Sequence, residues 1–477
     1  MRSAQVPVHL ILVALGFAVA GPAAAQRPKL SAATRSYVTV DTAIVALINA
    51  RVIDGRGGPA VENQTVLIRN GSIAAVGPSA SLATPAGAQV LDLTGKTVIP
   101  GLVMVHEHLY YPVLGGIYGN FTESFVKLYL AGGVTAMRTG GNMNGYAELN
   151  IAKAIARGDK PGPWIDATAP YLNGPNPFSQ MQSLGTPAEA RRFVDFWADQ
   201  GATSFKAYMQ IRREVLGAAI DQVHKRKLKV TGHLCSVTYR EAAELGIDNL
   251  EHGFLAATDF VAGKVPDECP GQGGGQGTIA SLDLNGVPFQ SLVADLVKRH
   301  VAVTSTLTVF ETFTPGRPKP PGIEVLVPEL AAAYDRQYAR VSAQTQSIYT
   351  TLFPKAMAME LAFARAGGLL IVGTDPTGGG GVIPGYSNQR AIELLVEAGF
   401  TPVEAIQIAT QNGARYLGLS DRLGTIEPGK QADLVIIRGN PAETIAEIRH
   451  VELVFKQGVG YDPAKLIAAV KGNVGLY

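Results

Sequence analysis

The sequence has few cysteines, little net charge and almost no long apolar runs. Cys235 and Cys269 are its only cysteines among 477 residues, so at most one disulfide can form within the chain, and their spacing does not show whether they pair. Charged residues make up 17% of the chain and the formal net charge is +2, which gives no electrostatic case for a nucleic-acid partner. Beyond the N-terminus no stretch is long enough to cross a bilayer.

The N-terminus has the three parts of a secretory signal peptide. Met1 and Arg2 precede the apolar run "HLILVALGFAVAG", and small residues follow at Ala23 and Ala25. We therefore expect residues 1–25 to be a signal peptide that is cleaved after Ala25, which predicts a secreted or periplasmic protein. An uncleaved anchor is the alternative, although the apolar run is short for a membrane span. Gln26 stands where a lipoprotein would carry cysteine.

The two ends of the mature chain share a β-rich pattern. Short alternating segments fill residues 45–97, with Asn70-Gly71 as a hairpin signal, and similar segments return at about 423–461. These patterns predict a small β-sandwich domain made of residues 26–97 plus 421–477.

The middle of the chain, residues 98–420, alternates apolar runs with helix-length segments. The expected strands are "VIPGLVMVH", "GVTAMRT", "WIDATA", "ATSFKAYM", "LKVTGHL", "DNLEHG", "VAVTSTLT" and "LLIVGTD". Eight such repeats predict an α/β fold, a (β/α)8 TIM barrel. Thr401-Pro402-Val403-Glu404 predicts a capped helix start. Two irregular insertions, 263–278 and 311–325, are either linkers or lids over the site.

Polar side chains gather where the predicted strands end, which is where a barrel keeps its active site. They are His106 and His108 on the first strand, Lys206 on the fourth, His233 on the fifth, His252 on the sixth and Asp375 on the eighth. Residues two apart on a strand face the same way, so His106 and His108 project together. Imidazoles with a carboxylate form the usual ligand set of zinc, manganese, cobalt or iron. The pattern therefore predicts a metal site.

Lys206 lies in an otherwise apolar strand. Such a lysine must reach solvent, pair with a carboxylate or lose its charge. A neutral lysine can react with carbon dioxide to give a carbamate whose oxygens could bridge two metals, whereas a structural ion pair is the alternative.

The motifs "VIDGRGGPAVENQTVLIRNGSIAAVG", "LDLTGKTVIPGLVMVHEHL", "VTGHL", "IDNLEHG", "VGTDP" and "LGTIEPGKQADLVII" together resemble the amidohydrolase superfamily. Within it, they are similar to the imidazolonepropionase-like and Xaa-Pro dipeptidase-like metal-dependent amide hydrolases. The resemblance implies a binuclear site with two divalent ions, zinc being expected. One ion would be bound by His106, His108 and Asp375 and the other by His233 and His252, with carboxylated Lys206 bridging them. It also implies attack by a bridging hydroxide, with Asp375 as catalytic acid and base.

These features predict a secreted metal-dependent amidohydrolase that cleaves an amide or peptide bond in a small substrate, such as a dipeptide or N-acyl amino acid. A mononuclear deaminase or imidazolone-type cyclic amide hydrolase is the first alternative. Those relatives usually lack the bridging lysine, and the deaminases usually have a glutamate where Ser236 stands. A non-catalytic assembly or binding protein on the same fold is the second alternative, but such members typically lose ligands.

Two residues are candidates for contacts with substrate. Tyr208 lies two positions after Lys206 and so faces the same way. Arg138 ends the second strand and could bind a substrate carboxylate or form an ion pair in the barrel rim. We expect no nucleic-acid partner, no membrane attachment after signal cleavage and, by analogy with relatives, a homo-oligomer.

Overall fold

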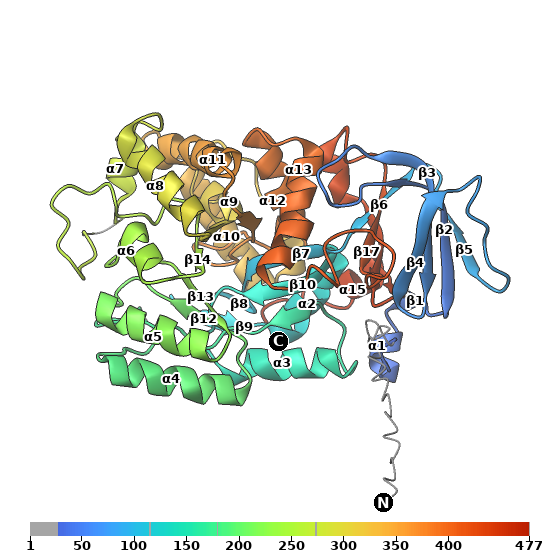
Figure 1. Cartoon of the computed structure of the whole chain (residues 1–477), viewed down its shortest axis with the longest axis horizontal. Coiled ribbons are helices and arrows are strands. Elements are labelled where there is room, and N and C mark those ends of the chain that lie inside the picture. The colour runs from blue at the N-terminus through green and yellow to red at the C-terminus, as the bar shows by residue number, and fades with distance from the viewer. Residues whose placement is uncertain (1–26, 114–115, 179, 272–273, 477) are drawn as a thin grey trace, which may run out of the picture.

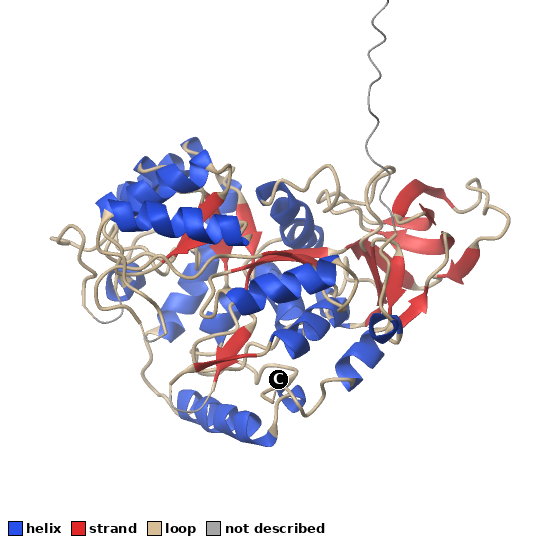
Figure 2. Cartoon of the chain, turned by 90° about the horizontal axis from the view of Figure 1, so that it is seen from below, coloured by secondary structure: helices blue, strands red, loops and turns tan. Residues whose placement is uncertain are grey.

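The computed structural model describes residues 27–113, 116–178, 180–271 and 274–476, so the predicted signal peptide lies outside the described residues. Helices surround parallel strands through most of the molecule, and a larger mixed sheet lies at one end (Figure 1). Figure 2 shows the same separation, with the strands of that sheet gathered beside the helical part. The chain is thus a mixed α/β protein.

The end sheet combines strands from both ends of the chain in the order β1-β19-β18-β17-β6-β2-β3-β4, with β5 paired to β2. β17 pairs antiparallel with β6, and Leu434 lies opposite Pro100. The structure describes this as one nine-stranded sheet, so the predicted sandwich form and domain boundaries stay predictions. Its strands are β1 (Val38–Val40), β2 (Ile44–Val52), β3 (Val61–Arg69), β4 (Ser72–Pro78), β5 (Gln89–Asp92), β6 (Lys96–Pro100), β17 (Leu434–Arg438), β18 (Val451–Lys456) and β19 (Val459–Tyr461).

The predicted hairpin at Asn70-Gly71 joins β3 to β4. Asn70 has φ 50° and Gly71 has φ 89°, which is the pair of positive φ values that a two-residue turn between twisted strands requires. The local sequence therefore specifies this turn.

The middle of the chain forms two parallel sheets, β11-β10-β7 and β12-β13-β14-β15-β16. A bridge between Thr168 and Ser204 joins β11 to β12, and the Asp375 amide donates to the His106 carbonyl at 3.1 Å on the opposite side. All eight strands match predicted segments: β7 (Leu102–Glu107), β10 (Val134–Thr139), β11 (Trp164–Asp166), β12 (Ser204–Ala207), β13 (Lys229–Gly232), β14 (Asn249–Leu250), β15 (Ala302–Ser305) and β16 (Leu370–Val372). β8 (Tyr110–Pro112) and β9 (Tyr118–Asn120) form a separate hairpin.

The strand β14 is shorter than its predicted segment "DNLEHG". Only Asn249 and Leu250 pair as strand, because the chain turns away at His252, whose φ is 67°. The turn leaves Glu251 and His252 at the carboxyl end of the sheet.

The predicted helix start at Thr401 is confirmed. The Thr401 hydroxyl accepts a hydrogen bond from the Glu404 amide at 3.3 Å, and the Glu404 carboxylate accepts one from the Thr401 amide at 2.8 Å. The helices are α1 (Ala32–Arg35), α2 (Thr122–Ala131), α3 (Tyr146–Ala156), α4 (Pro187–Gln200), α5 (Arg213–Lys225), α6 (Tyr239–Glu244), α7 (Gln276–Ser281), α8 (Val287–Lys298), α9 (Leu307–Glu311), α10 (Pro328–Ser342), α11 (Tyr349–Arg365), α12 (Tyr386–Glu397), α13 (Pro402–Gln407), α14 (Gly413–Tyr416) and α15 (Pro463–Ala468).

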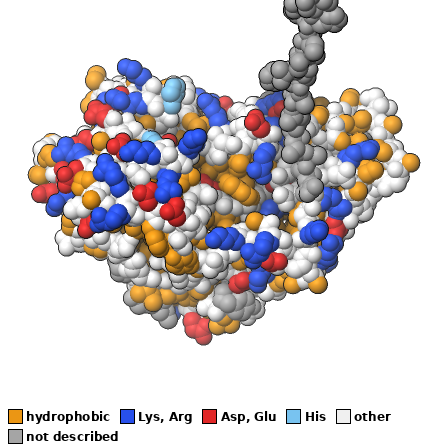
Figure 3. All heavy atoms as spheres, turned by 60° about the horizontal axis from the view of Figure 1, so that its bottom comes forward, with side chains coloured by type: hydrophobic (Ala, Val, Ile, Leu, Met, Phe, Trp, Pro, Cys, Tyr) orange, Lys and Arg blue, Asp and Glu red, His pale blue; other side chains and the backbone are white. Residues whose placement is uncertain are grey.

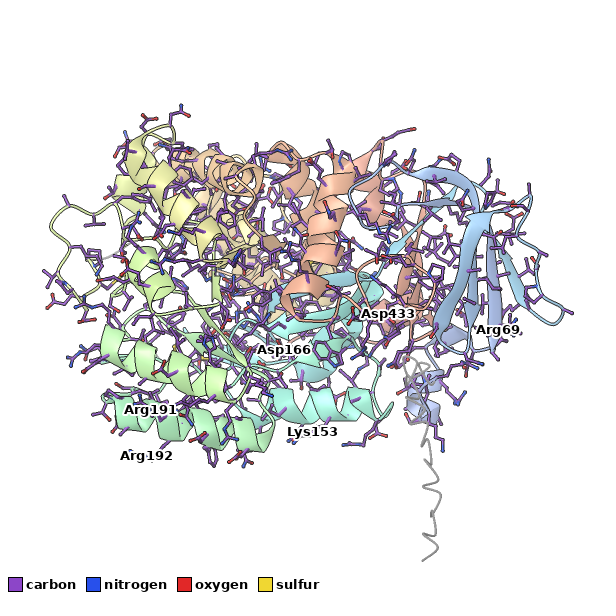
Figure 4. All side chains as sticks on the ribbon, viewed as in Figure 1. Arg69, Lys153, Asp166, Arg191, Arg192 and Asp433 are labelled. Carbon is purple, nitrogen blue, oxygen red and sulfur yellow. A yellow bond between two sulfur atoms is a disulfide. The ribbon has the colours of Figure 1, made fainter. Side chains whose placement is uncertain are left out.

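Charged side chains of both signs are interspersed over the face shown in Figure 3. Arg191 and Arg192 of α4 lie on the outer surface, far along the molecule from Asp433, which lies by the end sheet (Figure 4). Within the described ranges, no helix combines the length and apolar character that a membrane span requires.

Candidate metal centre

The structure brings together the six side chains that the sequence proposes as ligands. They come from the carboxyl ends of five strands: His106 in β7 with His108 just after it, Lys206 in β12, His233 after β13, His252 after β14 and Asp375 after β16. The Asp375 carboxylate lies 3.2 Å from His108 Nε2, 3.7 Å from His106 Nε2 and 3.6 Å from His252 Nδ1. The rings of His233 and His252 are centred 4.3 Å apart. Parallel strands place their ends at one rim, which explains this convergence.

His106, His108 and Asp375 form a group that could hold a metal ion. Their potential ligand atoms all lie within 4.8 Å of one another, and all three side chains are buried. Neutral imidazole and carboxylate suit zinc and similar divalent ions. These three side chains therefore suit the divalent metal ion that the sequence predicts.

Burial keeps most of these imidazoles neutral, as metal ligation requires. It lowers the pKa of His108 to about 4 and that of His233 to about 3. Burial alone would raise the pKa of Asp375, but His106, His108 and His252 outweigh it and hold that pKa well below its usual range. The centre therefore presents a carboxylate among imidazoles at neutral pH.

Two of these residues have unusual backbone geometry. His252 has φ 67° and Asp375 has φ 56°, in the left-handed region that costs a residue with a side chain about 1–3 kcal/mol. Such geometry concentrates at functional sites, where the surrounding fold holds it in place. For Asp375, the hydrogen bond to the His106 carbonyl supplies part of that support.

Two glycines fit closely against His106, Gly140 against its ring and Gly373 against its Cβ and backbone atoms. A Cβ atom added at Gly140 would lie 2.4 Å from the ring, and one added at Gly373 would lie 2.5 Å from the His106 Cβ atom. Any side chain at either position would displace His106 from the centre.

Glu251 is a member of this centre that the sequence reasoning missed. Its side chain is fully buried, and it accepts a hydrogen bond from His106 Nδ1 at 2.7 Å. Because this contact occupies Nδ1, it leaves Nε2 of His106 as the nitrogen directed at the metal group. A signal was present, since an acidic residue directly follows β14 and directly precedes the candidate ligand His252.

Lys206 is also fully buried, and its Nζ lies 3.8 Å from the Glu251 carboxylate. Burial lowers the pKa of Lys206 to about 8 although Glu251 opposes that shift. A lowered pKa increases the neutral fraction of this amine, which is the form that reacts with carbon dioxide.

Arg138 does not line the cavities beside the centre. It is buried, with hydrogen bonds to the Glu251 carboxylate at 2.6 Å, to Asn249 Oδ1 at 3.0 Å and to the Tyr416 hydroxyl at 2.9 Å. Of the two roles that the sequence allowed, the structure shows the ion pair, because the guanidinium is needed to neutralise a buried carboxylate.

Two cavities open from the centre and share His233, His252, Asp375 and Thr377. One of about 130 Å³ carries four tyrosines, Tyr110, Tyr118, Tyr171 and Tyr208, together with Met143, Phe178 and Met181. Tyr208 therefore lies where the sequence places it, with its ring centred 4.9 Å from that of His233. The other cavity, of about 240 Å³, is mainly apolar.

The comparisons with known proteins agree with this fold. The model of the amidohydrolase family matches residues 331–460. An adenine deaminase of Mesorhizobium japonicum is 24% identical over 405 residues, which are 84% of this chain and 54% of the deaminase, so the chain spans about half the length of that relative. An imidazolonepropionase of Deinococcus radiodurans is 25% identical over 403 residues, which are 81% of this chain and 88% of that protein.

A solved structure from Bifidobacterium longum, described as a candidate prolidase, superposes with a TM-score of 0.66 and 25% identity over 90% of this chain and 98% of its own. The fold is thus similar to that of metal-dependent amide hydrolases, and the candidate metal centre is of the kind that such enzymes use. The predicted resemblance to the amidohydrolases is confirmed by these matches, and with it the prediction of an amidohydrolase-type enzyme.

Proposed function

We propose that this protein is an exported binuclear metallohydrolase that cleaves an amide or peptide bond in a small substrate. The observation that carries the proposal is the convergence of four histidines, Asp375 and a buried lysine between two cavities. His106, His108 and Asp375 would hold one ion, and His233 and His252 the other. When bound, the ions would polarise the amide carbonyl and lower the pKa of a water molecule.

Lys206 is suited to bridge the two ions as a carbamate. Its neutral Nζ would form a bond to the carbon of carbon dioxide and lose one proton, which leaves a carboxylate with two donor oxygens. The buried position and the lowered pKa of Lys206 support this step, because a protonated amine cannot make the bond.

Asp375 has the position and charge of a proton carrier. Its carboxylate lies in both cavities and is ionised at neutral pH. It could therefore accept a proton from the attacking water and return it to the leaving nitrogen. Tyr208 could donate its hydroxyl to a polar group of the substrate in the smaller cavity.

The proposal also includes a closed barrel and export of the protein. We expect the two parallel sheets to close into one (β/α)8 barrel, since hydrogen bonds join them on both sides. Export is supported by the N-terminal sequence and by a disulfide between Cys235 and Cys269, a bond that persists in oxidising compartments.

A mononuclear deaminase or cyclic amide hydrolase is the second candidate, because relatives carry the names adenine deaminase and imidazolonepropionase. Ser236, which stands where deaminases usually have glutamate, is buried and donates its hydroxyl to the Ile211 carbonyl at 2.6 Å. It therefore offers no acid or base to this reaction.

The test is metal content per chain with turnover on dipeptides and N-acyl amino acids, for the native protein and for Lys206→Ala. We expect two ions per chain, loss of activity in the variant and partial rescue by a small carboxylate. Lys229→Ala, a half-buried lysine of the neighbouring strand β13, is the matched control and should keep both ions. One ion per chain and an active Lys206→Ala protein would favour the mononuclear alternative.

A further inference from the structure

The larger cavity beside the metal centre is built for an uncharged apolar group. Among the described residues that line it, only His233, His252 and Asp375 are ionisable, and these belong to the centre itself. The rest of the wall comes from apolar or neutral residues, among them Leu255, Ala256, Val309, Phe310 and Phe313. A cavity of about 150 Å³ lined by apolar side chains already holds benzene, so this one of about 240 Å³ has room for an aromatic side chain.

The aromatic part of this wall is fixed by its neighbours. The Phe310 ring is centred 6.1 Å from that of His252, which places it beside the metal centre. The ring of Tyr349 on α11 backs Phe313 at 5.4 Å, and Gln276 donates to the Tyr349 hydroxyl at 3.3 Å. An aromatic side chain of a substrate in this cavity could therefore pack against the rings of Phe310 and Phe313.

A disulfide secures another part of the cavity wall. Cys235 lines the cavity two residues after His233, and it is bonded to Cys269 in the long segment that follows β14, with their Cα atoms 4.9 Å apart. The same loop is held by the Thr258 hydroxyl, which donates to the Cys235 carbonyl at 3.0 Å, and by the Lys264 ammonium, which donates to the Ser236 carbonyl at 2.6 Å.

The glycines at the end of that segment touch the disulfide side of the cavity. A Cβ atom added at Gly274 would lie 3.3 Å from Cys235 Sγ, and one at Gly275 would lie 2.3 Å from the Ala257 carbonyl oxygen. Gly274 and Gly275 thus lie so close to Cys235 and Ala257 that a shift of the disulfide would move this part of the cavity lining with it.

We propose that this cavity binds an apolar, preferably aromatic, side chain next to the scissile amide, and that the Cys235–Cys269 disulfide sets its shape and hence the substrate selectivity. This inference rests on the proposed amide hydrolysis. The polar part of the substrate would then occupy the tyrosine-lined cavity on the other side of Asp375, where hydroxyl groups are available.

The experiment compares kcat/KM for Gly-Phe against Gly-Asp and for Phe-Gly against Asp-Gly on the metal-loaded protein. Since an apolar pocket discriminates by about tenfold or more, we expect the phenylalanine substrate to lead by at least that factor in one of the two orders. Ala256→Phe fills the cavity and should abolish the lead while Gly-Ala is still cleaved. Phe196→Ala, on the half-exposed ring of α4, is the control and should change nothing.

The disulfide is tested by Cys235→Ser with Cys269→Ser, and by reducing the metal-loaded native protein with a water-soluble phosphine, which takes up oxygen from water and is itself oxidised to its phosphine oxide. We expect KM for the phenylalanine substrate to rise about tenfold relative to KM for Gly-Ala. The reduced native protein keeps the test informative if the double variant does not fold.

The inference is wrong if kcat/KM for the phenylalanine substrates does not exceed that for the aspartate substrates. It is also wrong if the difference persists both in Ala256→Phe and after loss of the disulfide. Failure of the proposed function is a different result, namely that no amide is hydrolysed by the loaded protein. In that case calorimetric binding of free phenylalanine against free aspartate still tests the cavity, and equal affinities would reject it.

Discussion

Glu251 shows how a single buried residue orders the candidate metal centre. Its carboxylate accepts hydrogen bonds from His106, Arg138 and Thr231, so a charge that would be costly alone is fully paired. The pairing also directs His106 at the centre through Nε2. Residues that orient a metal ligand in this way act on metal affinity without touching the metal.

We expect Glu251→Gln to weaken metal binding by about 10–100-fold, because the carboxylate that orients His106 is lost. The measurement is competition with a chelator of known affinity. Glu148→Gln is the matched control, since Glu148 is also buried but bonds to Thr139 and Leu109, and burial raises its pKa to about 8. Equal metal affinity in the native protein and Glu251→Gln would contradict this role.

At the scale of single elements, local sequence rules describe the protein well where the signal is short-ranged. The cap of α13 and the Asn70-Gly71 hairpin occur as predicted, because each depends on residues within four positions of one another. Strand lengths are less predictable: β14 ends after Leu250 because tertiary contacts hold His252 in a turned backbone.

Thr401→Ala should lower the free energy of unfolding by about 1 kcal/mol, since the helix start loses the hydroxyl that accepts from the Glu404 amide. Denaturant unfolding measures this change. Thr401→Ser retains the hydroxyl and should stay close to the native protein. A Thr401→Ala protein as stable as native would show that the Glu404 carboxylate alone suffices.

At the scale of the whole molecule, the candidate ligands connect five strand ends of both parallel sheets. An ion bound there would therefore tie together parts of the chain from residue 106 to residue 375. Anything that binds the native state and not the unfolded chain stabilises the fold by mass action.

Removal of metal should accordingly lower the thermal midpoint, and readdition should restore it in proportion to the logarithm of metal concentration. Metal at 100 times its dissociation constant is worth about 2.7 kcal/mol. Scanning calorimetry with and without chelator measures this shift of the thermal midpoint. If Lys206 bridges the ions, chelator should shift the midpoint of Lys206→Ala by less than that of the native protein. A thermal midpoint that is the same with and without chelator would contradict the binding of a metal ion by these side chains.

The sequence by itself determined the eight strands, the hairpin, the helix cap and the identity of the six candidate ligands. It could do so because these features depend on local patterns and on the rule that parallel strands end at one rim. Tertiary structure alone decided the pairing of Cys235 with Cys269, the partnership of Arg138 with Glu251 and the division of the site into two cavities. Those features join residues 34 and 113 positions apart, or several loops at once, and no local pattern encodes which distant side chains will meet.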